Sequence, residues 1–371
     1  MKYVDEFRNP ELIKKTLDEI HRTVSPGEKY RIMEACGGHT YAIFHFGLQD
    51  LLPDNIEFIH GPGCPVCVLP IGRVDEGLSI AAKNEDVIFT AFGDVMRVPG
   101  QSGTPLSFKA RGFDVRMIYS PLDALDLALK NPDKKVVLFA IGFETTAPST
   151  ALTLIRAKEL NVENFFVYSN HVKIIPVLQS VLDQPGMKID AFIGPGHASV
   201  VIGSFPYNII AEKYDKPVVI AGFEPLDLLQ ATLMIIKQLK KGESRVENQY
   251  TRVVKDEGNL AALKTMDEVF ENRTTFEWRG LGLINNSALK LKPKYSKWDA
   301  EIHFDVERVE VKENKDARCG DILKGMLKPN ECKLFGKVCT PENPVGALMV
   351  SNEGACATYY NHLYSNVSPT T

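Results

Sequence analysis

VVLFAIGFETTAP, residues 136–148, joins an apolar run to a helix start through one glycine turn. Val136–Ile141 is apolar throughout and has the length of a strand, and Pro148–Leu160 has the length and pattern of an amphipathic helix. An apolar run of this length followed by a helix is typical of a strand that is buried on both faces of a parallel sheet. This stretch therefore predicts an α/β fold.

The same alternation of apolar runs and helical patterns repeats on both sides of this stretch. Six further runs have the length of strands: Ile56–His60, Val87–Phe92, Val115–Tyr119, Asn164–Tyr168, Ala191–Ile193 and Val218–Ala221. The other predicted helices are residues 5–24, Arg73–Ala82, Pro121–Lys130, Ile174–Asp183 and Leu226–Lys240. Strands that alternate with helices predict parallel sheets joined by crossover helices.

Most of the predicted strands end in a loop rich in glycine or proline. These loops are Gly61–Gly63, Phe92–Asp94, Gly142–Glu144, Gly194–His197 and Gly222–Pro225. In open α/β sheets, sites gather at the carboxyl ends of the strands, so we expect function in these loops. The dinucleotide-binding, P-loop and hydrolase-elbow motifs are absent from them. The helix start after Gly142 has the geometry that can bind an anion.

The composition is that of a globular protein without an unusual partner. The chain has 371 residues, of which 44% are hydrophobic and 24% charged, with a net charge of −4. The chain has no excess of basic residues, so its charge does not indicate nucleic acid as a partner. We expect no signal peptide and no membrane span, because the N-terminal residues carry charges and no run of about 18 apolar residues occurs. These features predict a cytoplasmic protein.

Seven cysteines fall into two groups with about 250 residues between them. In a reducing compartment, clustered cysteines more often bind metal or carry out redox chemistry than form structural disulfides. The second group has the spacing Cys319-x12-Cys332-x6-Cys339-x16-Cys356. It lacks the close Cys-x2–4-Cys pairs usual in zinc sites, so each thiol comes from its own loop. This pattern favours a [4Fe–4S] cluster, with zinc or an unmetallated small core as the alternatives.

The first group comprises a lone cysteine and a close pair. Tyr30–Ala35 is a short apolar stretch that leads into Cys36, which lies in a Gly-Gly-His loop where His39 is a candidate base or second ligand. The alternative is a buried thiol beside a capping histidine. Cys64 and Cys67 form a Cys-x-x-Cys directly after a predicted strand, a placement that suits a disulfide that opens and closes. Half of a zinc site and an inert pair are the other interpretations.

Several motifs together resemble one family, the hydrogenase maturation protein HypD. They are Met33–Thr40, His60–Cys67, Gly142–Thr146, Pro195–His197, Gly222–Asp227, Trp278–Gly282 and Cys319–Tyr360. They occur in order over nearly the whole chain. The resemblance implies a protein that helps to build the Fe(CN)₂CO unit of [NiFe]-hydrogenases with a small HypC-type chaperone and a HypE-type cyanide donor.

The resemblance also implies roles for individual residues. Cys36 holds the iron together with a HypC cysteine, while Cys64 and Cys67 are a redox pair. Cys319, Cys332, Cys339 and Cys356 ligate a [4Fe–4S] cluster, and His39 orients or protonates a ligand. Such a protein is a redox-active assembly scaffold rather than an ordinary turnover enzyme. A cluster-dependent protein disulfide reductase and a passive iron-binding scaffold are the alternatives.

The predicted architecture is two similar parallel-sheet α/β domains plus an irregular C-terminal iron–sulfur domain. The alternation stops near residue 242, and a segment rich in Gly, Pro, Asn and Cys closes the chain. The corresponding ranges are 1–140, which carries the Cys36 and Cys64/Cys67 loops, 141–242, and 243–371. The N-terminal helix of the first range is free to pack elsewhere.

Overall fold

Two parallel sheets form the framework of the computed structural model, which describes residues 4–311 and 314–365. Sheet A has the strand order β2-β1-β7-β8-β9, and sheet B has the order β4-β3-β5-β6. The strands of sheet A are β2 Ile56–His60, β1 Tyr30–Glu34, β7 Ala191–Pro195, β8 Val218–Ala221 and β9 Val246–Asn248. The strands of sheet B are β4 Val115–Ile118, β3 Val87–Phe92, β5 Lys135–Gly142 and β6 Phe165–His171. The α/β prediction and all seven predicted strands are confirmed.

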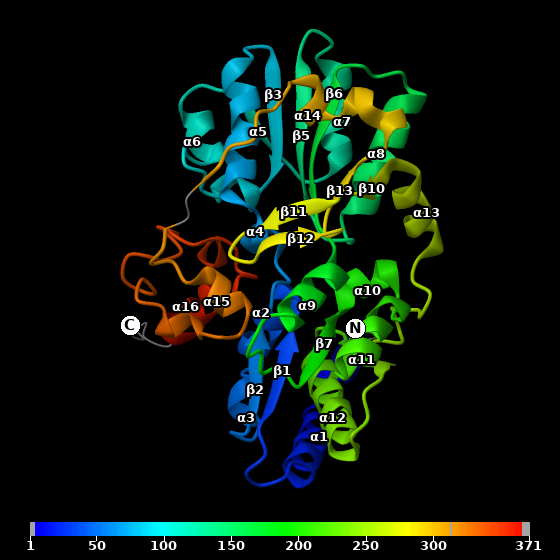
Figure 1. The fold of residues 1–371 in the computed structure, drawn as a ribbon, viewed down its shortest axis with the longest axis vertical. Helices are drawn as coiled ribbons and strands as arrows, with labels where there is room; N and C mark the ends of the chain where they lie inside the picture. The colour runs from blue at the N-terminus through cyan, green and yellow to red at the C-terminus, as the bar shows by residue number, and fades with distance from the viewer. Residues whose placement is uncertain (1–3, 312–313, 366–371) are drawn as a thin grey trace.

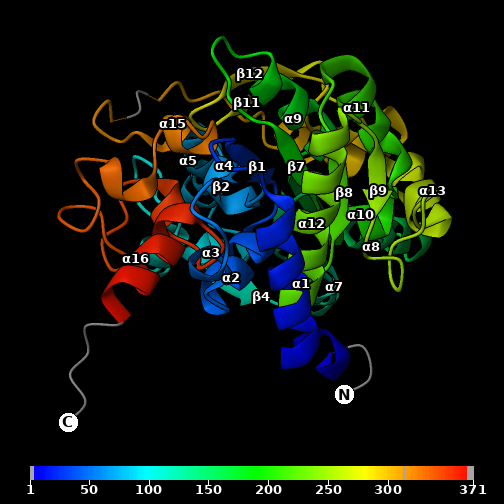
Figure 2. The same cartoon turned by 90° about the horizontal axis from the view of Figure 1, so that it is seen from below.

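Helices cover both sheets, and each predicted helix is present. The helices before and within the sheets are α1 Pro10–Thr23, α2 Gly37–His45, α3 Leu48–Leu51, α4 Pro65–Val68, α5 Ile71–Lys83, α6 Pro105–Ala110, α7 Pro121–Lys130, α8 Ala147–Glu159, α9 Ile174–Leu182, α10 Gly196–Ile202, α11 Asn208–Tyr214 and α12 Pro225–Lys241. The N-terminal helix α1 lies along α12 and buries Ile20 in the core beside sheet A (Figure 2). Short 3-10 turns lie at Asp5–Arg8, Val95–Arg97 and Phe205–Tyr207.

The two sheets divide the chain differently from the predicted ranges 1–140 and 141–242. Sheet A combines residues 30–60 with residues 191–248, whereas sheet B is built from residues 87–171. Residue 140 lies inside β5, so no boundary falls there. The chain leaves sheet A after β2, completes sheet B, and returns through α9. Local apolar patterns are alike in both sheets and do not encode which strands pair, because pairing depends on long-range packing.

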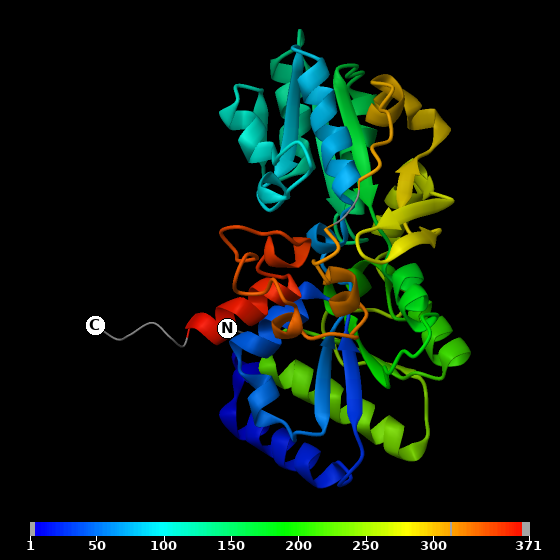
Figure 3. The same cartoon turned by 60° about the vertical axis from the view of Figure 1, so that its left-hand side comes forward.

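The segment after β9 packs on sheet B before it reaches the C-terminal cysteines. It contains α13 Leu260–Val269, two antiparallel pairs, and α14 Ala300–His303. The pairs are β10 Phe270–Asn272 with β13 Leu289–Leu291, and β11 Thr275–Trp278 with β12 Gly282–Asn285. The last elements are α15 Cys319–Leu323 and α16 Ala355–Ser365, with 3-10 turns at Pro293–Trp298, Pro329–Glu331 and Ala347–Met349. Helices α15 and α16 lie at the side of the molecule, between the two sheets (Figures 1 and 3).

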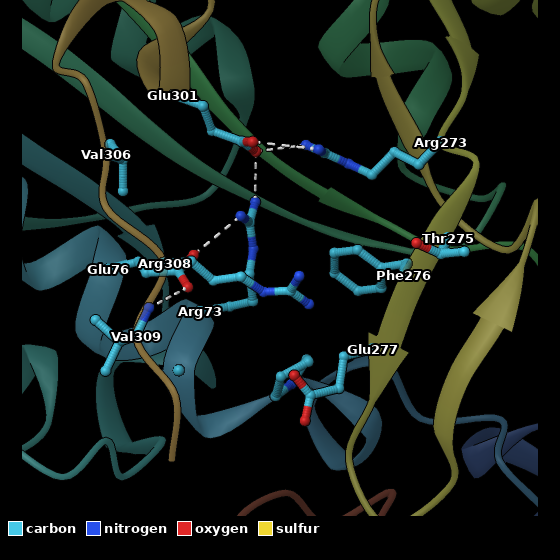
Figure 4. A pocket seen from close by; sticks show the side chains of 12 residues that line it. Arg73, Glu76, Arg273, Thr275, Phe276, Glu277, Glu301, Val306, Arg308 and Val309 are labelled. Carbon is cyan, nitrogen blue, oxygen red and sulfur yellow. Dashed lines mark hydrogen bonds and ion pairs between the residues drawn. The ribbon is translucent and has the colours of Figure 1, made fainter.

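A buried ion-pair network fixes this segment to α5. Arg73 of α5 donates to Glu301 at 2.6 Å and to Glu76 at 3.1 Å. Figure 4 shows Glu301 between the guanidinium groups of Arg73 and Arg273. Glu76 also accepts from the backbone N–H of Val309 at 3.0 Å. These ion pairs and hydrogen bonds join segments that are far apart in sequence.

A buried carboxyl group contacts the crossover from sheet B to sheet A. Glu144, after β5, accepts from the backbone N–H of Ile174 at 3.0 Å, at the start of α9. The side chain is buried, and burial raises its pKa from 4.5 to about 7. The start of α9 is therefore hydrogen-bonded to a carboxyl group whose ionised form is disfavoured by burial.

We expect Glu144→Gln to remove a pH dependence of stability. A carboxyl whose pKa is higher in the folded than in the unfolded state stabilises the fold most below the unfolded value. That contribution is lost as the pH rises through the folded value, so the window runs from about 4.5 to about 7. Over this window, the wild type should lose roughly 3 kcal/mol of unfolding free energy that the variant keeps.

Urea unfolding at several pH values measures this difference. The exposed Glu163→Gln is the matched control, and it should follow the wild-type curve. Parallel curves for the wild type and Glu144→Gln would refute the assignment.

Candidate functional site

The carboxyl ends of the two sheets face each other across the middle of the molecule (Figures 1 and 3). The loops at these ends line a cleft. Its volume is about 490 Å³, and most of its wall is apolar. The loops after β1, β2, β3, β5 and β7 all contribute to it. The polar or reactive side chains that line it are Cys36, Asp94, Thr145, Thr146, His197 and Glu353. Four of the five predicted glycine- or proline-rich loops are therefore brought together.

Cys36 lies at the end of β1, where it is the N-cap residue of α2. Its thiol is free and 7% exposed. Burial, together with the charges of Glu353 and Glu34, raises the pKa of Cys36 to about 12, against the lowering effect of the Gly38 and His39 N–H groups. The thiol is thus protonated at neutral pH, and a cation bound beside it would favour the thiolate.

A buried carboxylate positions the backbone of Cys36. Glu34 accepts from the Cys36 N–H at 3.0 Å, from His60 Nδ1 at 2.7 Å and from the Thr40 hydroxyl. Glu34 is completely buried, so these three donors replace the water that its carboxylate would otherwise bind. The sequence reasoning did not single out Glu34, although a charged residue inside an apolar stretch just before Cys36 was an available signal.

The His39 ring contacts the end of β8 and the loop after it. Its Nε2 hydrogen-bonds the carbonyl oxygen of Ala221 at 3.2 Å, and its ring lies 4.7 Å from that of Phe223. Burial lowers the pKa of His39 to about 4, so the imidazole is neutral at physiological pH. His39 is not part of the cleft wall. Its role as a base or ligand stays a prediction.

Cys64 and Cys67 form a disulfide at α4, directly beside the Cys36 loop. The two residues are 4% and 0% exposed, while Gly63, Pro65 and Val66 of the same loop line the cleft. Gly63 lies against the backbone of Ala35 and Cys36, and a Cβ there would overlap it. The disulfide is therefore held next to the cleft but behind its wall.

The four C-terminal cysteines surround one small cavity. Cys319 begins α15, Cys356 lies in the first turn of α16, and the loop between them supplies Cys332 and Cys339. All four thiols are free, and all but Cys332 are buried. The remaining wall is mostly apolar: Ala317, Ile322, Leu334, Phe335, Gly346, Leu348 and Met349.

This cavity has the donor chemistry that an iron–sulfur cluster needs. Burial raises the pKa of Cys319 to about 11, and burial with the neighbouring thiols raises the pKa of Cys356 well above its usual value. Four thiolates lining one cavity would need cations to offset their mutual repulsion. A side chain at Gly346 would overlap the Cys319 sulfur, so glycine keeps the cavity open. Within the described part of the chain, no three or more His, Cys, Asp or Glu side chains gather around a single point as they would for one ion.

The segment before Cys356 brings the two cysteine groups together, which the sequence did not predict. Gly354 lies so close to the disulfide that a Cβ there would be 3.1 Å from Cys67 Sγ. Glu353, one residue earlier, packs on Gly37 and faces the cleft. Arg97 of the β3 loop donates to the carbonyl oxygen of Val350 at 3.1 Å. One short segment thus contacts the cleft, the disulfide and the four-thiol cavity.

Comparison with known proteins gives the family. The HypD family model, described as the hydrogenase formation hypA family, matches residues 11–363. The hydrogenase maturation factor HypD of Escherichia coli is 52% identical over 367 residues, which is 98% of each chain. HypD of Rhodobacter capsulatus is 52% identical over 371 residues and HypD2 of Bradyrhizobium diazoefficiens 50% over 369, with at least 97% of each relative covered.

These similarities extend over nearly the full length of both partners, so the matched span contains the positions of the cleft, the disulfide and the four-thiol cavity. No helix within residues 4–311 or 314–365 is long and apolar enough to cross a membrane. The chain belongs to the HypD family of hydrogenase maturation factors.

Proposed function

We propose that this maturation factor assembles the Fe(CN)₂CO unit of [NiFe]-hydrogenases at Cys36. The observation that carries the proposal is the position of this thiol in a cleft whose wall the four-thiol segment completes through Glu353. Iron is the cargo: a thiolate is a soft anionic ligand that suits an iron bearing cyanide and carbon monoxide. The apolar wall excludes water around the bound unit.

Two features of the cleft support binding of iron by Cys36. The Glu34 carboxylate fixes the Cys36 backbone, so the thiol keeps one position. The thiol must lose its proton when it binds a cation. Glu353 lies on the same wall, and partial enclosure with the charges of Asp94 and Glu34 raises its pKa, which makes it a suitable proton acceptor.

The Cys64–Cys67 disulfide is the proposed redox element. Two electrons and two protons convert it to two thiols. A [4Fe–4S] cluster held by Cys319, Cys332, Cys339 and Cys356 would supply electrons one at a time. The contact of Gly354 with Cys67 gives the four-thiol region a direct path to the disulfide. Catalytic and redox-sensing disulfides also occur in the cytoplasm, which is the compartment that we propose for this protein.

The partners follow from the resemblance to the family. A HypC-type chaperone would bring a cysteine into the cleft as the second iron ligand, and a HypE-type protein would deliver cyanide. The cleft volume of about 490 Å³ accommodates a short inserted segment together with the iron unit. By contrast, a general protein disulfide reductase needs an accessible disulfide, whereas Cys64 and Cys67 are buried. The geometry therefore favours the assembly scaffold.

We expect the protein purified without oxygen to carry about four iron and four sulfide per chain, with a broad absorption band near 400 nm. Cys356→Ser should remove most of both, because the cavity then lacks one of its ligands. Cys36→Ser is the matched control and should keep the full content. A colourless wild-type protein with about one zinc would contradict the cluster proposal.

Cys64→Ser should abolish maturation while leaving the cluster in place. The variant cannot form the disulfide, yet it changes no residue of the four-thiol cavity. Hydrogenase activity in a host that lacks its own HypD-family factor, supplied with the cognate partners, measures maturation, and the iron and sulfide content reports the cluster. Normal activity of Cys64→Ser would show that the protein acts as a passive scaffold.

A further inference from the structure

A short segment of the C-terminal region, residues 350–353, runs between the two sheets at the cleft. Its first two residues contact the loop after β3, which belongs to sheet B. Its last residue, Glu353, lines the cleft and contacts the start of α2, which follows β1 of sheet A. The segment therefore joins the two sheets by non-covalent contacts, in addition to the chain crossovers that connect them.

On the sheet B side, side-chain hydrogen bonds attach the segment. Arg97, the last residue of the 3-10 turn Val95–Arg97, donates to the carbonyl oxygen of Val350 at 3.1 Å. The Ser351 hydroxyl donates to the Asp94 carboxylate at 3.4 Å. Arg97 and Asp94 are both exposed, so water competes for their hydrogen bonds. Each of these two bonds thus adds only modestly to the attachment.

On the sheet A side, the same part of the chain is closely packed. A Cβ added to Gly37 would be 2.5 Å from the Glu353 Cβ, so the chain at Glu353 lies directly against α2. Two rings of α16, those of Tyr359 and His362, pack on Phe44 of α2 with centroid distances of 4.7 and 5.2 Å. These contacts leave no space for water between the segment and α2.

The two attachments therefore differ in how easily they separate. Hydrogen bonds between exposed groups exchange with water at little cost. Packed rings and backbone separate only when the local structure unfolds. The Thr358 hydroxyl, which hydrogen-bonds the carbonyl oxygens of Asn352 and Gly354 at 2.9 and 3.0 Å, also ties the segment to α16. When the two sheets move apart, the segment should stay with sheet A and separate from the β3 loop.

We propose that residues 350–353 form a clasp that holds the cleft closed, and that release of this clasp from Arg97 and Asp94 opens the cleft to a segment of a partner protein. The movement is a hinge rotation of one sheet relative to the other about the crossovers. Cys36 is 7% exposed with the clasp in place, so a bulky group reaches its thiol only after release. The clasp goes beyond the proposed function, because it requires neither bound iron nor a cluster.

Arg111 is the matched control for charge. Like Arg97, it is exposed and belongs to the part of the chain that forms sheet B, where it follows α6. Its guanidinium lies over the rings of Phe108 and Phe113, at 4.3 and 5.4 Å from their centroids. Arg97→Gln and Arg111→Gln remove the same charge, so they differ in the loss of the contact with the clasp.

The experiment measures how fast a maleimide with a short polyethylene glycol chain modifies Cys36 in the full-length protein, purified without oxygen. Peptide mass spectrometry identifies the modified residue, so reaction at other thiols does not interfere. We expect Arg97→Gln to speed the modification about fivefold, because loss of one hydrogen bond shifts the equilibrium toward the open cleft by about that factor. Arg97→Lys, which keeps a donor, and Arg111→Gln should both stay near the wild-type rate. An unchanged rate in Arg97→Gln would overturn the proposal.

An effect of charge alone has the opposite sign. A positive charge favours the thiolate, which is the form that reacts, so loss of the Arg97 charge by itself would slow the modification. A slower reaction in Arg97→Gln would therefore also overturn the clasp.

Ser351→Ala tests the second hydrogen bond without any change of charge, and it should speed the modification by a smaller factor. Where Arg97→Gln fails to fold, as judged by circular dichroism, Ser351→Ala decides. A faster rate than that of the wild type supports the clasp, and an unchanged rate overturns it. None of these results depends on the iron or sulfide content, so the proposed function is tested separately.

Discussion

The carboxyl ends of the strands in sheet A face those in sheet B, and the rest of the structure depends on this constraint. Both sheets are parallel, so each collects its loops at one edge, and these two edges face each other. Cys36 from sheet A therefore meets Asp94 and Thr145 from sheet B in one cleft. Because the chain leaves sheet A and returns to it, motion of one sheet relative to the other would change the cleft directly.

The C-terminal region completes this cleft instead of standing apart from it. Glu353 forms part of the wall, and Gly354 touches the disulfide. Cys356 follows two residues later, in the first turn of α16. The distance along the chain from the cleft wall to the thiol cavity is thus three residues. A change in the cavity has a short covalent route to Glu353 in the cleft wall that Cys36 shares, which gives a physical reason for keeping both cysteine groups on one protein.

The sequence predicted elements well and their assembly poorly. Val136–Ile141 and the other apolar runs are strands because a short continuous apolar segment between glycine loops can bury all its side chains as a strand within a sheet. The sheet to which each strand belongs was not predictable. Strand β1 pairs with β7, which lies more than 150 residues away in the sequence, and β9 pairs with β8, which lies about 30 residues away. Arg31 and Glu34 interrupt the apolar pattern of β1, and only the structure shows that Glu34 has three buried donors.

At both cysteine sites, the surroundings disfavour the ionised form of a buried thiol. Burial raises the pKa of Cys36 and of Cys319, and carboxylates or neighbouring thiols raise each further. Such sites are stable with protons or with metal cations, but not as bare anions. Under the proposed function, iron would replace these protons, and the softness of the thiolate donors would select the cation.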